Sequence, residues 1–344
     1  MIDVLMPVRA PRLLRVLEFA LEGVEYRFVE KPRQGTRILF ALCTDQCGIH
    51  PQTLELLRLL RSETGVLEGC KAVVIVDGES ELYTKELAQE LCLAASLAGC
   101  CFPGKPLVEG TASLYNQHIL AQQRGLSVEQ TYLLRCRELV QRLLDYEPPR
   151  FERPSLLVLH ASEKGRSATL WLWEKLRRRL EEVCDIQEVS LQNGTIYDCR
   201  GCSYHACLHF AQNEGCFYGG AIAETVLPAI RRSNVLLFLC PNYNDAVSAN
   251  LTALFNRLTS FLLHSHLYDK YLYGMVVSGY SGSDLVARQL LGAMCLNKTA
   301  QLPPHFCMLQ TANDLQAIQQ LPKIEEQLDH FAEGILRNIL PTAK

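Results

Sequence analysis

A wholly apolar run, residues 235–240, is the segment that most limits what this chain can fold into. A strand buried on both faces, as in a parallel sheet covered by helices, has this composition. The run leads into a polar loop, residues 241–248, and then into Leu251, Leu254 and Leu258 at helical spacing. Because ligands of doubly wound sheets bind outside the carboxyl ends of the strands, this loop is the first candidate for a functional site.

The second half of the chain alternates apolar runs with amphipathic stretches. Helical patterns cover residues 169–183, with charged side chains on one face, and residues 221–232. Such alternation predicts a parallel sheet joined by right-handed crossovers. We expect its strands at residues 155–160, 185–190, 235–240, 271–278 and 305–309.

The first half repeats this rhythm, with helices expected between its strands. Residues 43–60 align without a gap on residues 240–257, so that a strand end, a polar loop and a leucine-bearing helix coincide. A tandem duplication explains this register, and so does the pattern that any two doubly wound domains share. We expect the strands at residues 2–6, 24–30, 36–43, 72–77 and 107–109.

Between the halves, residues 114–144 are mostly helical in pattern, and residues 147–154 form a proline-rich connector that cannot continue a helix. The sequence therefore predicts an α/β protein of two doubly wound parallel-sheet domains in tandem. They span residues 1–113 and 154–344, and a helical linker that ends in prolines, residues 114–153, joins them.

Bulk composition excludes several classes of function. The 344 residues are 48% hydrophobic and 21% charged, which suits two globular domains of roughly 150 residues each. A net charge of -3 gives no basic surface for a nucleic acid. No apolar run approaches the roughly 20 residues that span a bilayer, and the amino terminus lacks the basic head of a secretory signal, so we expect a cytoplasmic protein without a membrane partner. The fifteen cysteines, odd in number and mostly within apolar runs, favour free thiols over disulfides.

The loop after residues 155–160 carries groups that bind phosphate. Ser162, Ser167 and Thr169 supply hydroxyls, and Lys164 and Arg166 supply positive charge, just before a helix. The unpaired amides and the dipole at a helix start favour a dianion. A capped helix start with a solvated basic loop has the same residues. If the first and third strands flank the switch point, this loop, residues 241–248 and the glycine-bearing residues 278–283 line one crevice.

At these loops the chain resembles the NADPH-dependent FMN reductase family of flavodoxin-like flavoproteins. That family has a first loop of the form Gly-Ser-Pro-Arg followed by Asn-Thr, and a third strand that ends in Pro-x-Tyr before a helix carrying Asp-Arg. Residues 161–169 match the first motif, and residues 241–257 match the second from Pro241 to Asn256-Arg257. The resemblance spans about residues 154–310 and implies that the second domain is flavodoxin-like. Because the first half repeats the same rhythm, we expect the first domain to be a degenerate flavodoxin-like domain.

The resemblance further implies an FMN-dependent NAD(P)H oxidoreductase of the flavin or quinone reductase type, which passes hydride from NAD(P)H through FMN to an acceptor. The cofactor carries the chemistry, so no side chain is assigned a catalytic role. The implied partners are a small-molecule electron acceptor or a redox protein and a second copy in a homodimer. Ser162, Lys164, Arg166, Ser167 and Thr169 would hold the phosphate, and Pro241, Asn242, Tyr243, Asn244, Gly279 and Tyr280 would meet the flavin ring.

Two departures from the family motif leave an alternative open. Glu163 stands at the usual proline and Ala168 at the usual asparagine, so one phosphate hydrogen bond is missing and a negative charge lies nearby. A catalytically silent binding module that has lost FMN is the alternative that these residues suggest.

Four cysteines, Cys199, Cys202, Cys207 and Cys216, lie between the second and third strands of the second domain. Four thiolates within eighteen residues can ligate a [4Fe-4S] cluster or a zinc ion. An iron-sulfur branch of the family carries a tighter four-cysteine motif here, which makes an electron-transfer iron-sulfur flavoprotein an alternative function. Free thiols in a flap beside the flavin are the competing interpretation.

The first domain lacks the phosphate-binding and flavin-binding motifs of the second. Residues 7–12 contain no hydroxyl and no glycine, and Asp45 stands where a flavin would approach, so we expect no flavin there. Cys43 and Cys47 have no second pair of ligands, which favours buried thiols over a metal site. We expect this domain to serve packing, dimer formation or the shape of the acceptor site.

Overall fold

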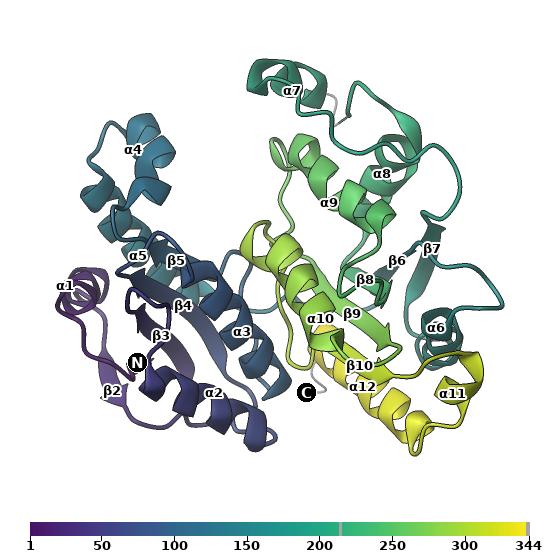
Figure 1. The fold of residues 1–344 in the computed structure, drawn as a ribbon, viewed down its shortest axis with the longest axis horizontal. Helices are drawn as coiled ribbons and strands as arrows, with labels where there is room; N and C mark the ends of the chain where they lie inside the picture. Colours follow the sequence, from purple (N-terminus) through teal and green to yellow (C-terminus); the bar gives the residue numbers. More distant parts are fainter. Residues whose placement is uncertain (213–214, 342–344) are drawn as a thin grey trace. The chain divides into compact units, whose positions relative to one another are not determined.

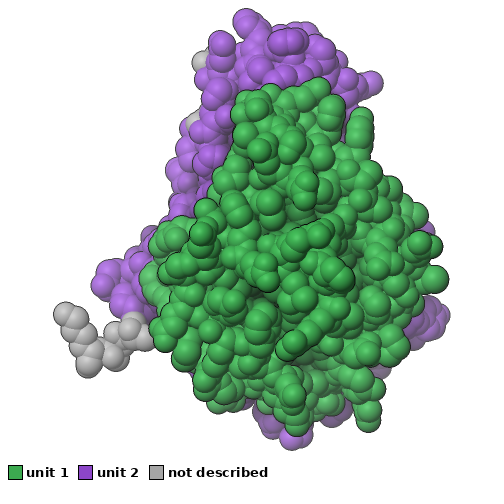
Figure 2. All heavy atoms as spheres, turned by 90° about the vertical axis from the view of Figure 1, so that its left-hand side faces the viewer, with its two compact units in different colours: residues 1–147 green, residues 148–344 purple. Residues whose placement is uncertain are grey.

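The chain folds into two α/β units, each built around one parallel sheet, in the computed structural model, which describes residues 1–212 and 215–341 (Figure 1). Residues 1–147 form the first unit and residues 148–344 the second, as Figure 2 shows in green and purple. All ten expected strands are present, each with ends within two residues of those predicted. Helices flank both sheets.

The first sheet has the strand order β2-β1-β3-β4-β5, which is the flavodoxin-like order. All its strand pairs are parallel. The elements of this unit are β1 (Ile2–Leu5), α1 (Pro11–Ala20), β2 (Tyr26–Val29), β3 (Arg37–Thr44), α2 (Pro51–Ser62), β4 (Lys71–Gly78), α3 (Thr84–Leu97), β5 (Leu107–Gly110), η1 (Tyr115–Gln117), α4 (His118–Arg124) and α5 (Val128–Asp145).

The helices that the sequence assigned to a linker belong to the first unit. Helix α5 packs on β4, β5 and α1, and its Tyr132, Cys136 and Leu139 share one buried cluster with Ile2 and Leu39. Its amphipathic face is therefore part of the first core, as expected for a helix with one apolar stripe. The predicted linker is corrected to a short connector, because the boundary between the units falls after residue 147.

A second difference from expectation lies between β2 and β3, where residues 30–36 form a loop without a helix. Asp3 on the neighbouring β1 is 1% exposed and lies between two arginines. Its carboxylate is 2.7 Å from Arg27 Nε and 3.0 Å from Arg33 Nη2. These arginines cover part of the sheet face that a crossover helix would cover.

The second sheet has the order β10-β9-β8-β6-β7, which is the same flavodoxin-like order read from the other edge. No helix within residues 1–212 and 215–341 is both long and apolar enough to cross a membrane. The elements of this unit are β6 (Ser155–His160), α6 (Ala168–Leu180), β7 (Asp185–Ser190), α7 (Tyr204–Ala211), η2 (Ile222–Val226), α8 (Leu227–Arg232), β8 (Val235–Pro241), α9 (Ala249–Leu262), β9 (Tyr271–Ser278), α10 (Ser283–Leu291), η3 (Gly292–Leu296), β10 (Cys307–Thr311), α11 (Leu315–Gln319) and α12 (Ile324–Ile339).

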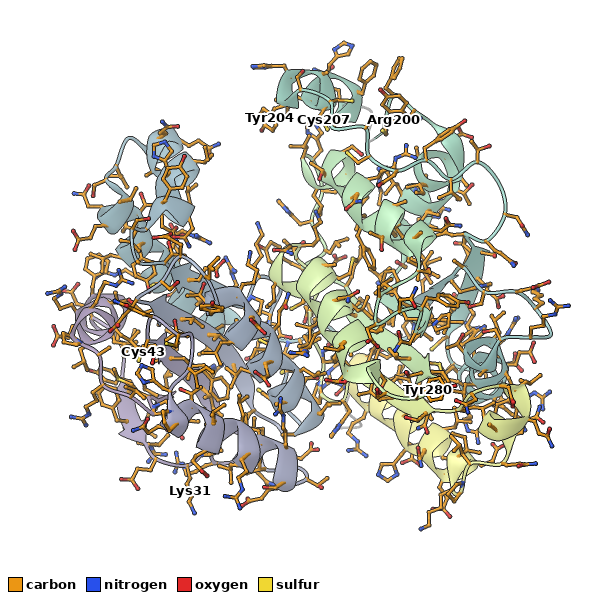
Figure 3. All side chains as sticks on the ribbon, in the orientation of Figure 1. Lys31, Cys43, Arg200, Tyr204, Cys207 and Tyr280 are labelled. Carbon is orange, nitrogen blue, oxygen red and sulfur yellow. The ribbon has the colours of Figure 1, made fainter. Side chains whose placement is uncertain are left out.

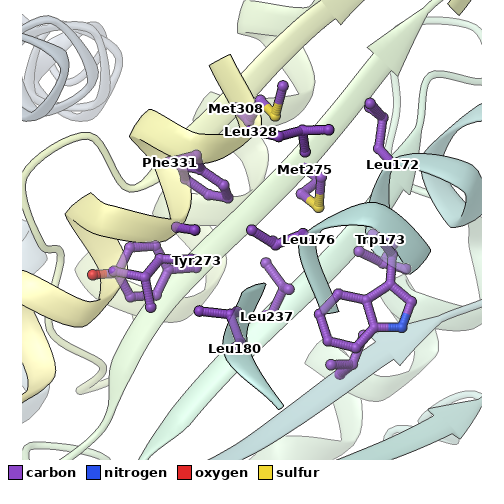
Figure 4. Close-up of a cluster of buried hydrophobic side chains, with 14 of the residues drawn as sticks. Leu172, Trp173, Leu176, Leu180, Leu237, Tyr273, Met275, Met308, Leu328 and Phe331 are labelled. Carbon is purple, nitrogen blue, oxygen red and sulfur yellow. The ribbon is translucent and has the colours of Figure 1, made fainter. Parts of the chain in front are cut away.

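The core of the second unit confirms the prediction made from the apolar run. Every residue from Val235 to Cys240 in β8 is fully buried. On the face shown in Figure 4, Leu237 packs with Trp173 and Leu176 of α6 and Phe331 of α12. Each large apolar side chain buried in this way contributes roughly 1.5–3 kcal/mol, so the sheet is a rigid base for the loops at its carboxyl edge.

Candidate functional site

The three predicted loops start from one edge of the second sheet. Strand β8 pairs in parallel with β6 on one side and with β9 on the other. In this register His160 lies beside Leu239, and Pro241 lies beside Val277. The loops after β6, β8 and β9 therefore begin at neighbouring points, at the carboxyl edge where doubly wound sheets bind ligands.

Three hydroxyls of the first loop cluster at the start of α6. Ser167 is the N-cap, and its Oγ accepts a hydrogen bond from the amide of Leu170 at 3.3 Å. Thr169 Oγ1 lies 2.7 Å from Ser167 Oγ and 3.5 Å from Ser162 Oγ. Ser162 and Thr169 are buried. Short hydroxyl donors beside the free amides of a thirteen-residue helix suit an anion.

The two cations of this loop lie outside that cluster. Lys164 and Arg166 are both exposed, and the Arg166 side chain keeps 83% of its accessible surface. Arg166 Nη1 lies 3.8 Å from Glu163 Oε2, so the acid that departs from the family motif partly neutralises the predicted phosphate ligand. The structure thus brings together the hydroxyls of the predicted site and leaves the two cations at its periphery.

His160, the last residue of β6, is a site residue that the sequence analysis missed. Its Nδ1 accepts a hydrogen bond from the amide of Ser162 at 3.3 Å, which fixes the start of the first loop. Burial lowers the pKa of His160, although Glu188, 3.3 Å from Nε2, acts in the opposite direction. A polar residue at the end of an otherwise apolar strand was the available signal. The neutral imidazole leaves Nδ1 free to accept.

The second loop is a tight hairpin turn. Tyr243 and Ala246 exchange backbone hydrogen bonds of 3.4 and 3.1 Å. Between them Asn244 and Asp245 have φ angles of 53° and 57°, the left-handed pair that defines a type I′ turn. Asn and Asp tolerate this conformation better than other residues with a side chain, so the Asn-Asp dipeptide was a sequence signal for the turn.

Side chains tie the second loop to the third. Asn242 Nδ2 donates hydrogen bonds to Ser278 Oγ at 2.9 Å and to the carbonyl oxygen of Ser281 at 3.0 Å. Gln289 of α10 donates to the carbonyl oxygen of Asp245 at 2.8 Å and accepts from the amide of Val247 at 3.0 Å. The predicted contact residue Asn242 is thus a link between two loops, and the sequence analysis missed Gln289.

Gly282, at the end of the third loop, has a φ of 86°, and any Cβ there would collide with the carboxylate of Asp245. Only glycine therefore allows the second and third loops to approach this closely. The close approach explains why the third loop carries glycine at this position.

The remaining residues predicted to contact the flavin ring include buried polar atoms without a partner among the described residues and exposed aromatic rings. The Oδ1 of Asn242 and the Oγ of Ser248, which precedes α9, are buried without a hydrogen-bond partner in the described part of the chain. Tyr243 is 55% exposed, and Tyr280, which Figure 3 labels, is 86% exposed. Pro241 and Gly279 are half-buried beside them. A ligand seated at this edge would find polar atoms that the protein itself leaves unpaired.

The four predicted metal ligands share one cavity elsewhere in the second unit. Cys199, Cys202, Cys207 and Cys216 line a space of about 240 Å³ together with aromatic side chains and Arg257. Burial raises the pKa of Cys207, and the other three thiols raise it further. Within residues 1–212 and 215–341, no three His, Cys, Asp or Glu side chains are placed as metal ligands. The prediction of four metal ligands is therefore not supported by the geometry.

Helix α9 holds this cysteine segment in place. Arg257, 3% exposed, donates hydrogen bonds to the carbonyl oxygens of Tyr197 at 3.3 Å and Gly219 at 2.9 Å. Asn256 Nδ2 donates to Asp198 at 2.9 Å. The Asn256-Arg257 pair of the second motif therefore anchors the chain on both sides of α7.

Two cysteines of the first unit differ in exposure. Cys43 is buried, and burial raises the pKa of its thiol to about 11. Cys47 is exposed, so the expectation of a buried thiol was wrong for this residue, because the turn after β3 carries it out of the apolar run.

Comparisons with known proteins show what the second unit is similar to. No curated protein matches the chain. Among solved structures, an azoreductase from Bacillus anthracis str. Sterne is 13% identical, with 54% of this chain and 99% of that chain covered and a TM-score of 0.40. An NAD(P)H:quinone oxidoreductase from Methanothermobacter marburgensis is 13% identical, with 56% and 100% covered and a TM-score of 0.40. Residues 154–314, which lie within the second unit, match the family model of the NADPH-dependent FMN reductases.

Proposed function

We propose that the second unit binds FMN and that the chain is an NAD(P)H-dependent FMN oxidoreductase of the flavin or quinone reductase type. The observation that carries this proposal is the cluster of Ser162, Ser167 and Thr169 hydroxyls at the start of α6, at the sheet edge where the loops after β8 and β9 also begin. A helix start with hydroxyl donors favours a phosphate group, and the neighbouring loops supply a surface for a flat ring.

The residues at this edge fit FMN. The three hydroxyls and the first amides of α6 would bind the phosphate dianion, while the positive charges of Lys164 and Arg166 attract it from the periphery. Asn242, Tyr243, Asn244, Pro241, Gly279 and Tyr280 form the ring side. The unpartnered Asn242 Oδ1 and Ser248 Oγ are polar atoms that a bound ligand would satisfy.

The protein's part in the reaction is to bind and orient. When bound, FMN supplies the ability to take two electrons from NAD(P)H and pass them on. The links from Asn242 to Ser278 and from Gln289 to Asp245 keep the second and third loops rigid, so that the ring-side groups stay in place. The acceptor in this proposal is a small molecule such as a quinone or free flavin, or a redox protein, and the functional form is a homodimer.

A spectrum of the purified full-length chain tests the proposal. We expect the absorption bands of oxidised flavin, and their bleaching under anaerobic conditions when NADH or NADPH is added. Colourless protein that gains no thermal stability with added FMN would instead support a silent binding module, because a ligand that binds only the folded state raises its stability. The acid at Glu163, paired with Arg166, would then be the reason for the loss.

A second candidate function, electron transfer through an iron-sulfur cluster, has one observation on its side. The four thiols of the cysteine segment line one cavity, although no three of the described side chains are placed there as metal ligands. Anaerobic purification separates the two functions: a cluster gives a brown protein with about four iron and four sulfide per chain. A yellow protein without iron supports the simple reductase.

A further inference from the structure

A cavity of about 710 Å³ lies in the first unit, at the carboxyl ends of β1 and β2, and none of the residues that line it belongs to the sites described above. Leu5 of β1 and Val29 of β2 form its floor, and Leu56 and Leu59 of α2 form one wall. Its volume falls within the roughly 300–1,000 Å³ of small-molecule pockets, and its lining is mostly apolar, as theirs is.

The cavity exists because no crossover helix joins β2 to β3 in the first unit. In the second unit the connection from β7 to β8 carries α8, whose Leu227 and Ile230 are buried and which packs against β6. In the first unit the corresponding connection, residues 30–36, contains no helix. The cavity therefore lies where the second unit has an apolar helix, and this explains why the floor of the cavity is apolar.

Charged side chains close the other half of this uncovered face. In the parallel register Asp3 lies beside Arg27, and Leu5 lies beside Val29. Alternation along a strand puts Asp3 on the same face as Leu5, and Arg27 on the same face as Val29. The ion pairs of Asp3 thus fill the half near the strand starts, and the half near the carboxyl ends remains hollow.

Two cations stand at the rim without a carboxylate partner. In the described ranges, residues 1–212 and 215–341, neither Arg9 nor Lys31 lies within ion-pair distance of an acid. The Arg9 guanidinium lies 5.9 Å from the centre of the Phe28 ring, and Lys31 extends from the loop after β2 near α2 (Figure 3). Of the two lining acids, Glu55 pairs with Arg58 at 3.5 Å, which leaves Glu30 against two cations. The rim therefore favours an anionic group.

We propose that this cavity binds a small amphipathic anion, with an apolar body on Leu5, Val29 and Leu59 and a carboxylate or sulfonate head between Arg9 and Lys31. The apolar floor supplies most of the affinity, and the two cations supply the selectivity for negative charge. This site is independent of FMN, because it uses only residues of the first unit.

A pair of fluorescent probes tests the site in the full-length chain saturated with FMN. The anionic probe is 8-anilinonaphthalene-1-sulfonate, and the neutral probe is N-phenyl-1-naphthylamine. The double substitution Arg9→Gln/Lys31→Gln is expected to weaken binding of the anionic probe about 10-fold, since it removes both charge-assisted hydrogen bonds to the sulfonate. It is expected to leave the neutral probe within about twofold. Leu59→Trp, at a half-buried position, fills the hollow and is expected to abolish binding of both probes.

Arg15→Gln is the matched control, because Arg15 is an exposed cation of the first unit that lies outside the cavity lining. We expect it to bind both probes like the natural sequence, and thermal denaturation checks that every variant is folded. Equal binding of the anionic probe by the natural chain and the double variant would overturn the proposal. So would retention of both probes by folded Leu59→Trp, or an equal loss of the anionic probe in Arg15→Gln. If the protein binds no FMN but gives this pattern of probe binding, the proposed function is wrong and the proposed anion site still stands.

Discussion

Replacing Ser167 with aspartate is expected to weaken FMN binding by about 100-fold or more while the chain stays folded. Aspartate is as good an N-cap as serine, so α6 keeps its start and the stability without ligand changes by less than about 0.5 kcal/mol. The new carboxylate would stand beside Thr169, at the place proposed for the phosphate. Two like charges about 5 Å apart at an effective dielectric constant of 20 repel by about 3 kcal/mol, which exceeds a 100-fold change in Kd.

Riboflavin, which lacks the phosphate, makes this prediction specific. Titration of the ligand-free protein should show that Ser167→Asp loses affinity for FMN and keeps its affinity for riboflavin. Ser127→Asp is the matched control, since Ser127 caps α5 in the same way, with Oγ accepting from the amide of Gln130 at 3.1 Å. That variant should bind FMN like the natural chain. If Ser167→Asp binds FMN with unchanged affinity, the phosphate does not lie at the start of α6.

Much of the fold could be predicted because parallel strands buried on both faces leave a local signal. The apolar run of β8 and the matching runs of β3 and β4 are typical of such strands, and their positions were correct. The membership of α5 could not be predicted in this way. Its amphipathic pattern shows that one face is buried, and only the tertiary contacts of Tyr132 and Leu139 show that the first sheet buries it.

The parts of the candidate site that are close in sequence could be predicted, and those that depend on distant residues could not. The hydroxyl cluster at the start of α6 spans eight residues, from Ser162 to Thr169, so its parts were visible together in the sequence. The bonds between Gln289 and the second loop join residues 42 and 44 positions apart. No short motif encodes such a link, because it depends on how α10 is placed against the end of β8. Rigid support from distant residues is therefore the part of a site that the sequence alone leaves out.

Replacing Arg12 with alanine is expected to destabilise the first unit by about 3 kcal/mol at neutral pH, because it leaves a buried carboxylate without its partner. Arg12 Nε donates to both carboxylate oxygens of Asp77, at 2.7 and 3.0 Å, and Arg12 Nη2 donates to the carbonyl oxygen of Gly78 at 2.8 Å. Asp77 is 5% exposed and also accepts a hydrogen bond from Tyr132 Oη at 3.3 Å. Together with a bond of 3.4 Å from Arg12 Nη2 to the carbonyl oxygen of Gly110, these bonds join the start of α1 to the ends of β4 and β5.

The loss in Arg12→Ala should depend on pH in a defined direction. Burial raises the pKa of Asp77, and the hydrogen bond and charge of Arg12 act against this rise. Without Arg12 the pKa of Asp77 rises further, so the folded state binds the proton more tightly than the unfolded state does. Stability then increases as pH falls through the folded pKa of Asp77, and the variant should recover part of its loss in mild acid.

Hydrogen exchange in β3 and β4 measures this effect in the first unit separately from the second. Arg15→Ala is the matched control, since Arg15 is on the same helix and exposed, and it should cost less than about 0.5 kcal/mol. The double variant Arg12→Ala/Asp77→Asn should be more stable at neutral pH than Arg12→Ala alone, because it removes the uncompensated charge. A double variant that is no more stable, with no gain in acid for Arg12→Ala, would mean that the bonds of Arg12 to the backbone, rather than its charge, hold this end of the sheet together.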